Sequence, residues 1–138
     1  MASRLYNIIN SIVTKKQDKV NFSRYTSFDS KAVASGTSAY TKIGSITVPA
    51  GKGIVQAGVS FPSNATGQRR VLISDASSSP SLTRNSAVTQ MAVNGVNTNM
   101  QVNMLTDTAS STTLYLYAMQ NSGSSLNVNG YFGYFIMP

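Results

Sequence analysis

Two hydrophobic periods divide the chain. Near the N-terminus the apolar residues have helical spacing, because Leu5, Ile8 and Ile12 fall on one face of a helix. From about residue 26 the apolar residues alternate with Ser, Thr, Asn and Gln, which is typical of strands with one face on a core and the other in water. The pattern predicts an N-terminal helical segment at 1–25 and a β-structured head at 26–138.

Short alternating runs in the head are separated by turns rich in Gly, Asn, Ser and Pro, and they recur about every 10 to 15 residues. The predicted strands are 43–48, 55–61, 69–74, 88–93, 100–104, 112–120, 126–128 and 131–137, with a short further strand near 31–34. Such a series, without a repeat of fixed length, indicates an antiparallel sandwich or barrel. The jelly roll, with eight strands in two sheets, is one of these folds.

The last two long runs, 112–120 and 131–137, are apolar or aromatic on both faces. A half-exposed sheet would leave four aromatic side chains uncovered: Tyr115, Tyr117, Phe132 and Tyr134. An apolar patch of that size needs a cover. The cover is either the chain's own loops or another subunit, and tyrosine side chains are typical of subunit interfaces.

The N-terminal segment also needs a partner, because a helix of about 14 residues is marginal in water by itself. It either packs on its own head or associates with copies of itself. Leu5, Ile8 and Ile12 have the three–four spacing of a heptad seam, and isoleucine at seam positions favours trimers or larger bundles. We therefore predict a homotrimer, whose interface combines these three residues with the four aromatic residues above.

The composition excludes several kinds of chemistry. The chain has no Cys, His, Trp or Glu, and its only carboxylates are Asp18, Asp29, Asp75 and Asp107. Without His or Cys there is no His-based triad, thiol nucleophile, zinc site or disulfide framework. The four Asp residues lie in different segments, so nothing local pairs them for acid–base work. We predict a protein that is not an enzyme and needs no cofactor or metal.

The net charge of +7 is unevenly distributed. Residues 1–52 carry eight Lys or Arg and two Asp, whereas 53–138 carry three Arg and two Asp. Binding of nucleic acid needs a basic groove lined with stacking aromatic residues, and here the charge and the aromatic residues lie largely in different halves, since seven of the twelve aromatic residues are in 53–138. We therefore expect no nucleic-acid partner, and we interpret the basic N-terminal segment as a site for docking on an acidic partner surface or as a solvated segment.

Arg69 and Arg70 are the candidate ligand-binding residues. They follow the loop at 63–67, and loops on a rigid sandwich commonly carry binding sites. Arginine forks suit carboxylates and phosphates, which occur in acidic sugars and teichoic acid. The alternative is an ordinary strand whose alternate side chains are solvated.

No apolar run reaches the length of a membrane span. The first 13 residues contain an apolar stretch, but polar residues interrupt it and no small-residue cleavage site follows. We expect no signal peptide, synthesis in a host cytoplasm and no membrane partner.

Three stretches resemble a known family. Residues 46–61, with the turn Pro49-Ala50-Gly51, are similar to the opening strands of head domains from bacteriophage tail-tip, baseplate and fibre proteins. Residues 114–126 resemble the penultimate hairpin of these domains. The ending 128–136 resembles the closing strand of TNF-like and complement-type heads.

The resemblance covers roughly residues 28–138 and implies an all-β, antiparallel jelly-roll sandwich of about eight strands that assembles as a trimer. The expected function is that of a virion structural protein, a receptor-binding or fibre head that attaches to host cell-surface polysaccharide and holds another virion protein through its N-terminal segment. The alternatives are a capsid decoration or head-fibre protein with a structural role, and a bacterial adhesin subunit.

Overall fold

The computed structural model describes residues 4–9, 24–37, 39–80 and 86–137. Residues 4–9 are helical, and eight strands follow. The strands are β1 (Arg24–Val33), β2 (Thr41–Val48), β3 (Gly51–Phe61), β4 (Gln68–Ser74), β5 (Ser86–Met91), β6 (Thr98–Thr108), β7 (Thr112–Gln120) and β8 (Leu126–Ile136). The all-β expectation with a short N-terminal helix is therefore confirmed.

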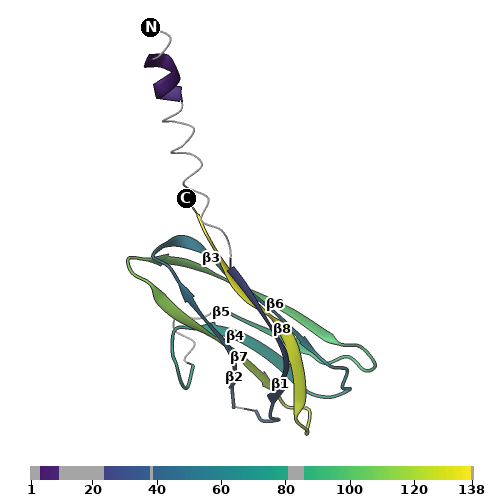
Figure 1. The fold of residues 1–138 in the computed structure, drawn as a ribbon. Helices are drawn as coiled ribbons and strands as arrows, with labels where there is room; N and C mark the ends of the chain where they lie inside the picture. The colour runs from purple at the N-terminus through teal and green to yellow at the C-terminus, as the bar shows by residue number, and fades with distance from the viewer. Residues whose placement is uncertain (1–3, 10–23, 38, 81–85, 138) are drawn as a thin grey trace.

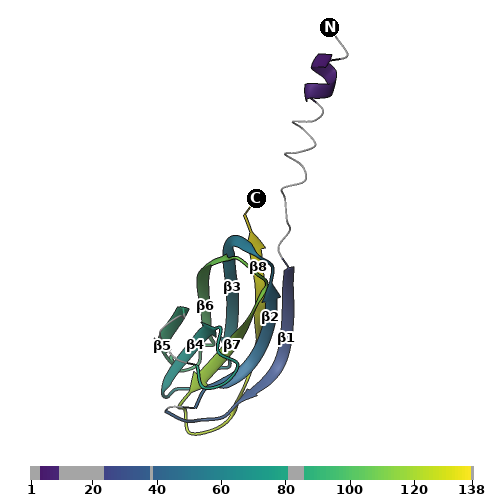
Figure 2. The same ribbon diagram turned by 90° about the vertical axis from the view of Figure 1, so that its left-hand side faces the viewer.

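The strand pairing is that of one long hairpin wrapped around itself. From the outside of this hairpin inward, β1 pairs with β8, β2 with β7, β3 with β6 and β4 with β5, all antiparallel. Wrapping adds the pairs β3–β8 and β4–β7. The result is two four-stranded layers, a first sheet in the order β1-β8-β3-β6 and a second sheet in the order β2-β7-β4-β5 (Figures 1 and 2). This arrangement of eight strands is a jelly roll.

Alternating apolar side chains from both sheets fill the space between the layers. In β3 the inward residues include Val55, Ala57 and Phe61, and in β7 they include Leu114 and Leu116, all nearly or fully buried. These are the positions that the two-residue period placed on one face. Burying side chains of this kind contributes about 1.5–3 kcal/mol each, which makes the interior the main source of stability.

Two strands differ from the expectation. The predicted short strand near 31–34 is the end of β1, a ten-residue strand at the edge of the first sheet. The two predicted strands 126–128 and 131–137 form the single strand β8, because Gly130 continues the ladder with β3 instead of turning the chain. β8 therefore lies between β1 and β3, and its residues follow one alternation from end to end.

Candidate functional site

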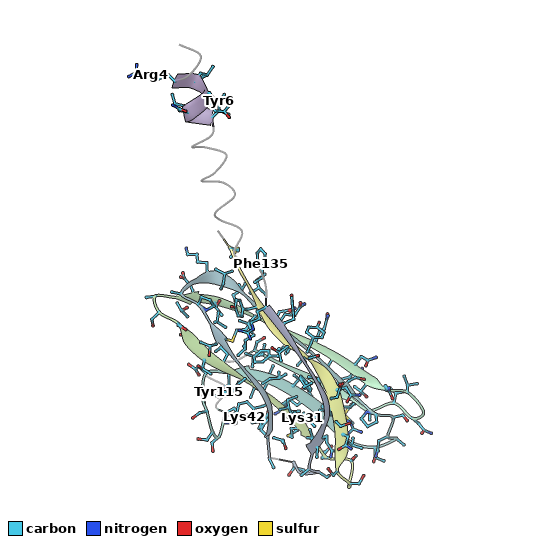
Figure 3. The ribbon with its side chains drawn as sticks, in the orientation of Figure 1. Arg4, Tyr6, Lys31, Lys42, Tyr115 and Phe135 are labelled. Atoms are coloured by element: carbon cyan, nitrogen blue, oxygen red, sulfur yellow. The ribbon has the colours of Figure 1, made fainter. Side chains whose placement is uncertain are left out.

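The chain's own loop at 75–80 covers the part of the outer face of the second sheet around Tyr117. Tyr117 is only 3% exposed, and its hydroxyl donates to the carbonyl oxygen of Ala76 at 2.8 Å. Lys42 lies over the ring of Tyr115 at 4.8 Å and donates to the carbonyl oxygen of Ser77 (Figure 3). The expectation that Tyr117 needs another subunit to cover it is therefore corrected, because a loop of the same chain buries it.

Burial, with a smaller contribution from nearby Tyr115, raises the pKa of the Tyr117 hydroxyl above its ordinary value of 10.0. The folded protein then holds a proton that the unfolded chain releases above about pH 10, so stability falls as the pH rises beyond that point. We expect Tyr117→Phe to cost about 1 kcal/mol at neutral pH through the lost hydrogen bond. The variant should also lose less stability than the wild type in urea titrations above about pH 10.

Tyr115→Phe is the matched control, because the Tyr115 hydroxyl makes no hydrogen bond to another described residue. It should leave the free energy of unfolding at neutral pH unchanged. An equal loss of stability in the two variants would contradict a specific role for the Tyr117–Ala76 contact.

Phe132 and Tyr134 both point into the sandwich. Phe132 is 2% exposed and belongs to the core, and Tyr134 packs against the same core. The expectation that these two side chains lie uncovered is wrong for the single chain. The outward aromatic residues of β8 are instead Tyr131 and Phe135, one position away in the alternation.

Arg69 and Arg70 lie on opposite faces of β4, so they do not form one site. Arg69 is fully buried, where its guanidinium lies 5.9 Å from the ring of Phe61, and burial lowers its pKa. Arg70 donates to the hydroxyls of Thr89 and Tyr40, both at 3.0 Å. The predicted ligand site built from both guanidinium groups is therefore corrected, since Arg69 cannot reach a ligand on the surface.

The N-terminal helical residues present their apolar side chains to solvent. Leu5 is 61% exposed and Ile8 is 55% exposed. Ile12, the third predicted seam residue, lies outside the described residues. The role of this segment in trimer formation stays a prediction.

The outer face of the first sheet carries an uncovered cluster of aromatic and aliphatic side chains. Leu105 is 78% exposed and pairs in register with Ile54, which pairs on its other side with Phe135. These three residues, here called the apolar end, line a shallow hollow of about 450 Å³. Phe135 marks this end of β8 in Figure 3. Exposed apolar surfaces that extend over several residues are typical of surfaces where proteins make contact with a partner.

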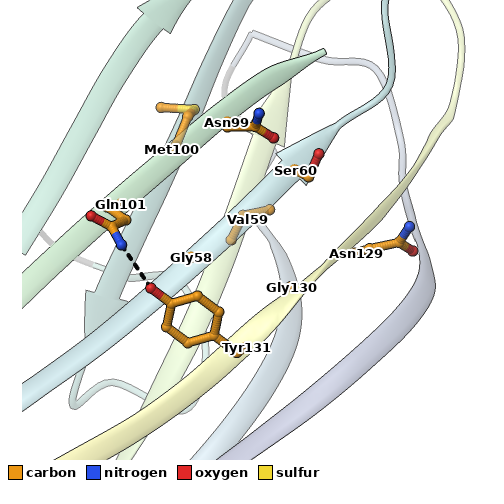
Figure 4. A pocket seen from close by; sticks show the side chains of 9 residues that line it. All are labelled: Gly58, Val59, Ser60, Asn99, Met100, Gln101, Asn129, Gly130 and Tyr131. Carbon is orange, nitrogen blue, oxygen red and sulfur yellow. Dashed lines mark hydrogen bonds between the residues drawn. The ribbon is translucent and has the colours of Figure 1, made fainter.

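A second hollow, of about 530 Å³, lies further along the same face (Figure 4). This tyrosine hollow is lined by Gly58, Val59, Ser60, Asn99, Met100, Gln101, Asn129, Gly130 and Tyr131. The hydroxyl of Tyr131 accepts a hydrogen bond from Nε2 of Gln101 at 2.8 Å. Amide side chains line both hollows: Gln56 and Asn103 lie in the first, and Asn99, Gln101 and Asn129 lie in the second.

The sequence could not bring these residues together. The two hollows collect side chains from β1, β3, β6 and β8, whose members are up to about a hundred positions apart in the chain. The signal that existed was local: Asn and Gln alternate with buried apolar residues along β6. Without the strand order, those amides look like ordinary solvated positions.

The described residues offer no metal-ligating cluster, since no three His, Cys, Asp or Glu side chains gather among them. None of the helical residues that the structure describes belongs to a helix long and apolar enough to cross a membrane.

No protein-family model matches the sequence, and no curated protein matches it. Solved structures do match the fold. The chain aligns over 86% of its length with 34% of the chain in the crystal structure of the infectious bursal disease virus VP2 subviral particle, at a TM-score of 0.61 and 14% identity. For the T13 particle of the same virus the coverages are 86% and 32%, the TM-score 0.63 and the identity 14%.

The chain thus spans about a third of the length of these viral proteins. At this identity the likeness establishes the fold alone, a jelly roll that is found in proteins of virus particles. The resemblance read from the sequence is supported at that level. The finer assignment to a phage tail or fibre head stays a prediction.

Proposed function

We propose that the protein is a non-enzymatic structural subunit of a virus particle, which associates with copies of itself through the apolar end of the first sheet. The observation that carries the proposal is the contrast between the two sheets. On the second sheet the loop at 75–80 covers the outer face around Tyr117, whereas Ile54, Leu105 and Phe135 are left exposed on the first sheet.

The rim of the apolar end suits a second copy. Lys52 and Asp107 lie side by side there, 3.8 Å apart and both 72% exposed. Each copy thus offers one cation and one anion beside its apolar surface, so Lys52 of one copy can pair with Asp107 of another. Complementary charges at a rim favour one orientation of two apolar surfaces over others.

The similar solved proteins belong to a subviral particle and a T13 viral particle, so jelly rolls of this kind occur in assemblies of many copies. This supports a place in the virion and a subunit role for the present chain. We keep the homotrimer as the proposed building unit, with the exposed Leu5 and Ile8 available for contacts between N-terminal segments or with another virion protein.

Sedimentation velocity on the purified full chain tests self-association. The proposal expects trimers or larger assemblies at micromolar concentration, with closed or extended particles visible by electron microscopy at higher concentration. A monomer across the whole micromolar range would contradict it.

Two finer functions fit the same architecture. A receptor-binding or fibre head attaches to the host surface, and the amide-rich hollow around Tyr131 favours this function. A capsid decoration or head-fibre protein needs no such attachment. Labelled protein applied to host cells separates them, because only the receptor-binding function expects saturable binding.

A further inference from the structure

We propose that the tyrosine hollow on the first sheet binds a neutral oligosaccharide. The inference goes beyond self-association, because the hollow is complete within one copy of the chain. It rests on three features: how the ring of Tyr131 is held, which groups surround it, and which groups are missing around it.

The ring of Tyr131 lies against β3 where that strand has no side chain. A Cβ atom at Gly58 would lie 2.8 Å from Cζ of the ring, so the ring occupies the space that any other residue would fill. Figure 4 shows Tyr131 beside Gly58 with its hydroxyl directed at Gln101. The ring of Tyr25 meets it edge-on, with centroids 5.9 Å apart. Three contacts therefore fix the ring against the sheet.

A fixed aromatic ring is a platform for a sugar. One face of a pyranose ring presents polarised C–H groups, and these are attracted to the electron-rich face of an aromatic ring. Holding the ring before binding reduces the entropy that is lost when the ligand arrives. Tyr131 is partly exposed, so part of its surface remains available to a ligand.

The groups around the ring match sugar hydroxyls. Asn99, Gln101 and Asn129 come from two strands that flank β3, and Ser60 adds a hydroxyl. An amide offers both donors and an acceptor, as each hydroxyl of a sugar requires. The amide of Asn99 makes no hydrogen bond to another described residue, so its donors and acceptor face solvent.

None of the nine described residues that line the hollow is charged. A carboxylate or phosphate on the ligand would be partly removed from water in the hollow and would find no cationic side chain among these nine residues to pair with, which is unfavourable. The hollow therefore suits neutral sugars better than acidic ones. This differs from the acidic ligands that the two arginines on β4 would have implied.

The hollow and the apolar end are separate places on one face. Gly58 follows Ile54 by four residues on β3, which corresponds to about 13 Å along the strand. A single shallow hollow binds a sugar weakly, with a dissociation constant of roughly millimolar size. Several copies in one assembly would bind a polysaccharide far more tightly than one copy.

Saturation-transfer NMR on the full chain tests the proposal with maltotetraose, cellotetraose and chitotetraose as neutral probes and sialyllactose as the acidic probe. We expect at least one neutral probe to bind at roughly millimolar concentration, and sialyllactose to bind more weakly. No neutral binding up to about 10 mM, or stronger binding of sialyllactose, would overturn the proposal.

Two variants localise the binding. Tyr131→Ala should weaken it at least about tenfold through loss of the platform. Asn99→Ala removes one amide from an exposed position without touching the ring, and should weaken binding severalfold while the melting temperature stays unchanged. Tyr115→Ala, on the outer face of the second sheet, is the matched control and should bind as the wild type does. Wild-type affinity in both Tyr131→Ala and Asn99→Ala would overturn the assignment.

Leu105→Asp separates this inference from the proposed assembly. The substitution leaves the tyrosine hollow unchanged. Each copy of the variant should therefore bind the neutral probe with wild-type affinity, whether the variant is a monomer or an oligomer. Loss of probe binding together with loss of assembly would overturn a site that is complete in one copy.

Discussion

Leu105→Asp is expected to convert the assembled protein into monomers. Among the described residues of the head, Leu105 is the most exposed large apolar one, at 78%. On the outer face of the first sheet it lies beside Ile54 of β3 and two positions before the rim residue Asp107. If copies meet there, each contact buries this side chain, which contributes about 1.5–3 kcal/mol. Asp at this position makes no such apolar contribution, and the contact would also have to remove its carboxylate from water, which is unfavourable.

The effect on the fold itself should be small. Leu105 points away from the core, and substitutions at exposed positions change stability by less than about 0.5 kcal/mol. Sedimentation velocity and a thermal melt on the same sample therefore separate assembly from folding. The expected result is a monomeric variant that still unfolds in one cooperative thermal transition.

Met91→Asp is the matched control, because Met91 is 62% exposed but lies on β5, at the edge of the second sheet. It replaces a large exposed apolar side chain by the same carboxylate on a different surface, and it should leave the assembly intact. If both variants dissociate to the same extent, the apolar end is not the surface that copies share.

The pattern in the sequence predicts strands best where the two faces of a strand differ. β3 and β6 alternate apolar with polar residues, and the structure buries the apolar set of each. β7 has apolar residues on both faces, yet its bounds were predicted because a turn lies at each end. What its pattern could not show is that the loop at 75–80 folds back over Tyr117.

The alternation in β8 is ambiguous in a different way. Its aromatic residues Tyr131, Phe132, Tyr134 and Phe135 occupy both parities, so either set could face the core. The start of β8 carries the missing signal, because Leu126 and Val128 are buried and Asn127 and Asn129 are exposed, so the even positions face the core. A turn expected near Gly130 separates this signal from the aromatic residues, and only the continuous ladder with β3, in which Ala57 lies opposite Phe132, extends it to them.

Arg69 also departs from its local pattern. Its position in the alternation of β4 is an inward one, shared with Val71 and Ile73, and inward positions select apolar residues. From the sequence alone, an arginine at position 69 indicates that this end of the strand is exposed to solvent. The structure instead closes the sandwich over it, because Gln120 lies in register beside it and Phe61 beneath it.

Replacing this buried charge gives the second large effect. Arg69→Met is expected to raise the free energy of unfolding by about 2 kcal/mol. The guanidinium is fully buried, its Nη1 donates to the carbonyl of Gln68 at 3.3 Å, and its Nε and Nη2 find no partner among the described residues. No carboxylate of the described residues pairs with this cation, so nothing offsets the free energy needed to remove it from water. Methionine fills a similar volume and carries no charge that must be desolvated.

Gln120→Met provides the control of opposite sign. Gln120 is also fully buried, but its amide donates to the carbonyls of Val33 and Ser124, and its oxygen accepts from the backbone N–H of Ser122. Removing it leaves the backbone N–H of Ser122 without this acceptor, and the carbonyls of Val33 and Ser124 keep only the hydroxyls of Ser125 at 3.4 Å and of Ser122 at 3.2 Å. We therefore expect Gln120→Met to lower the free energy of unfolding by about 1–3 kcal/mol. The two neighbouring substitutions to methionine should therefore shift stability in opposite directions.

Urea unfolding at neutral pH measures both changes on one scale, provided that the slope with denaturant is the same in each variant. For a domain of this size the gain from Arg69→Met corresponds to a melting temperature about 6 °C higher. A loss of stability in Arg69→Met would mean that the guanidinium has partners in solution, such as ordered water, that satisfy Nε and Nη2. The sign of the change in the free energy of unfolding thus decides whether Arg69 destabilises the sandwich through its desolvation or stabilises it through polar contacts.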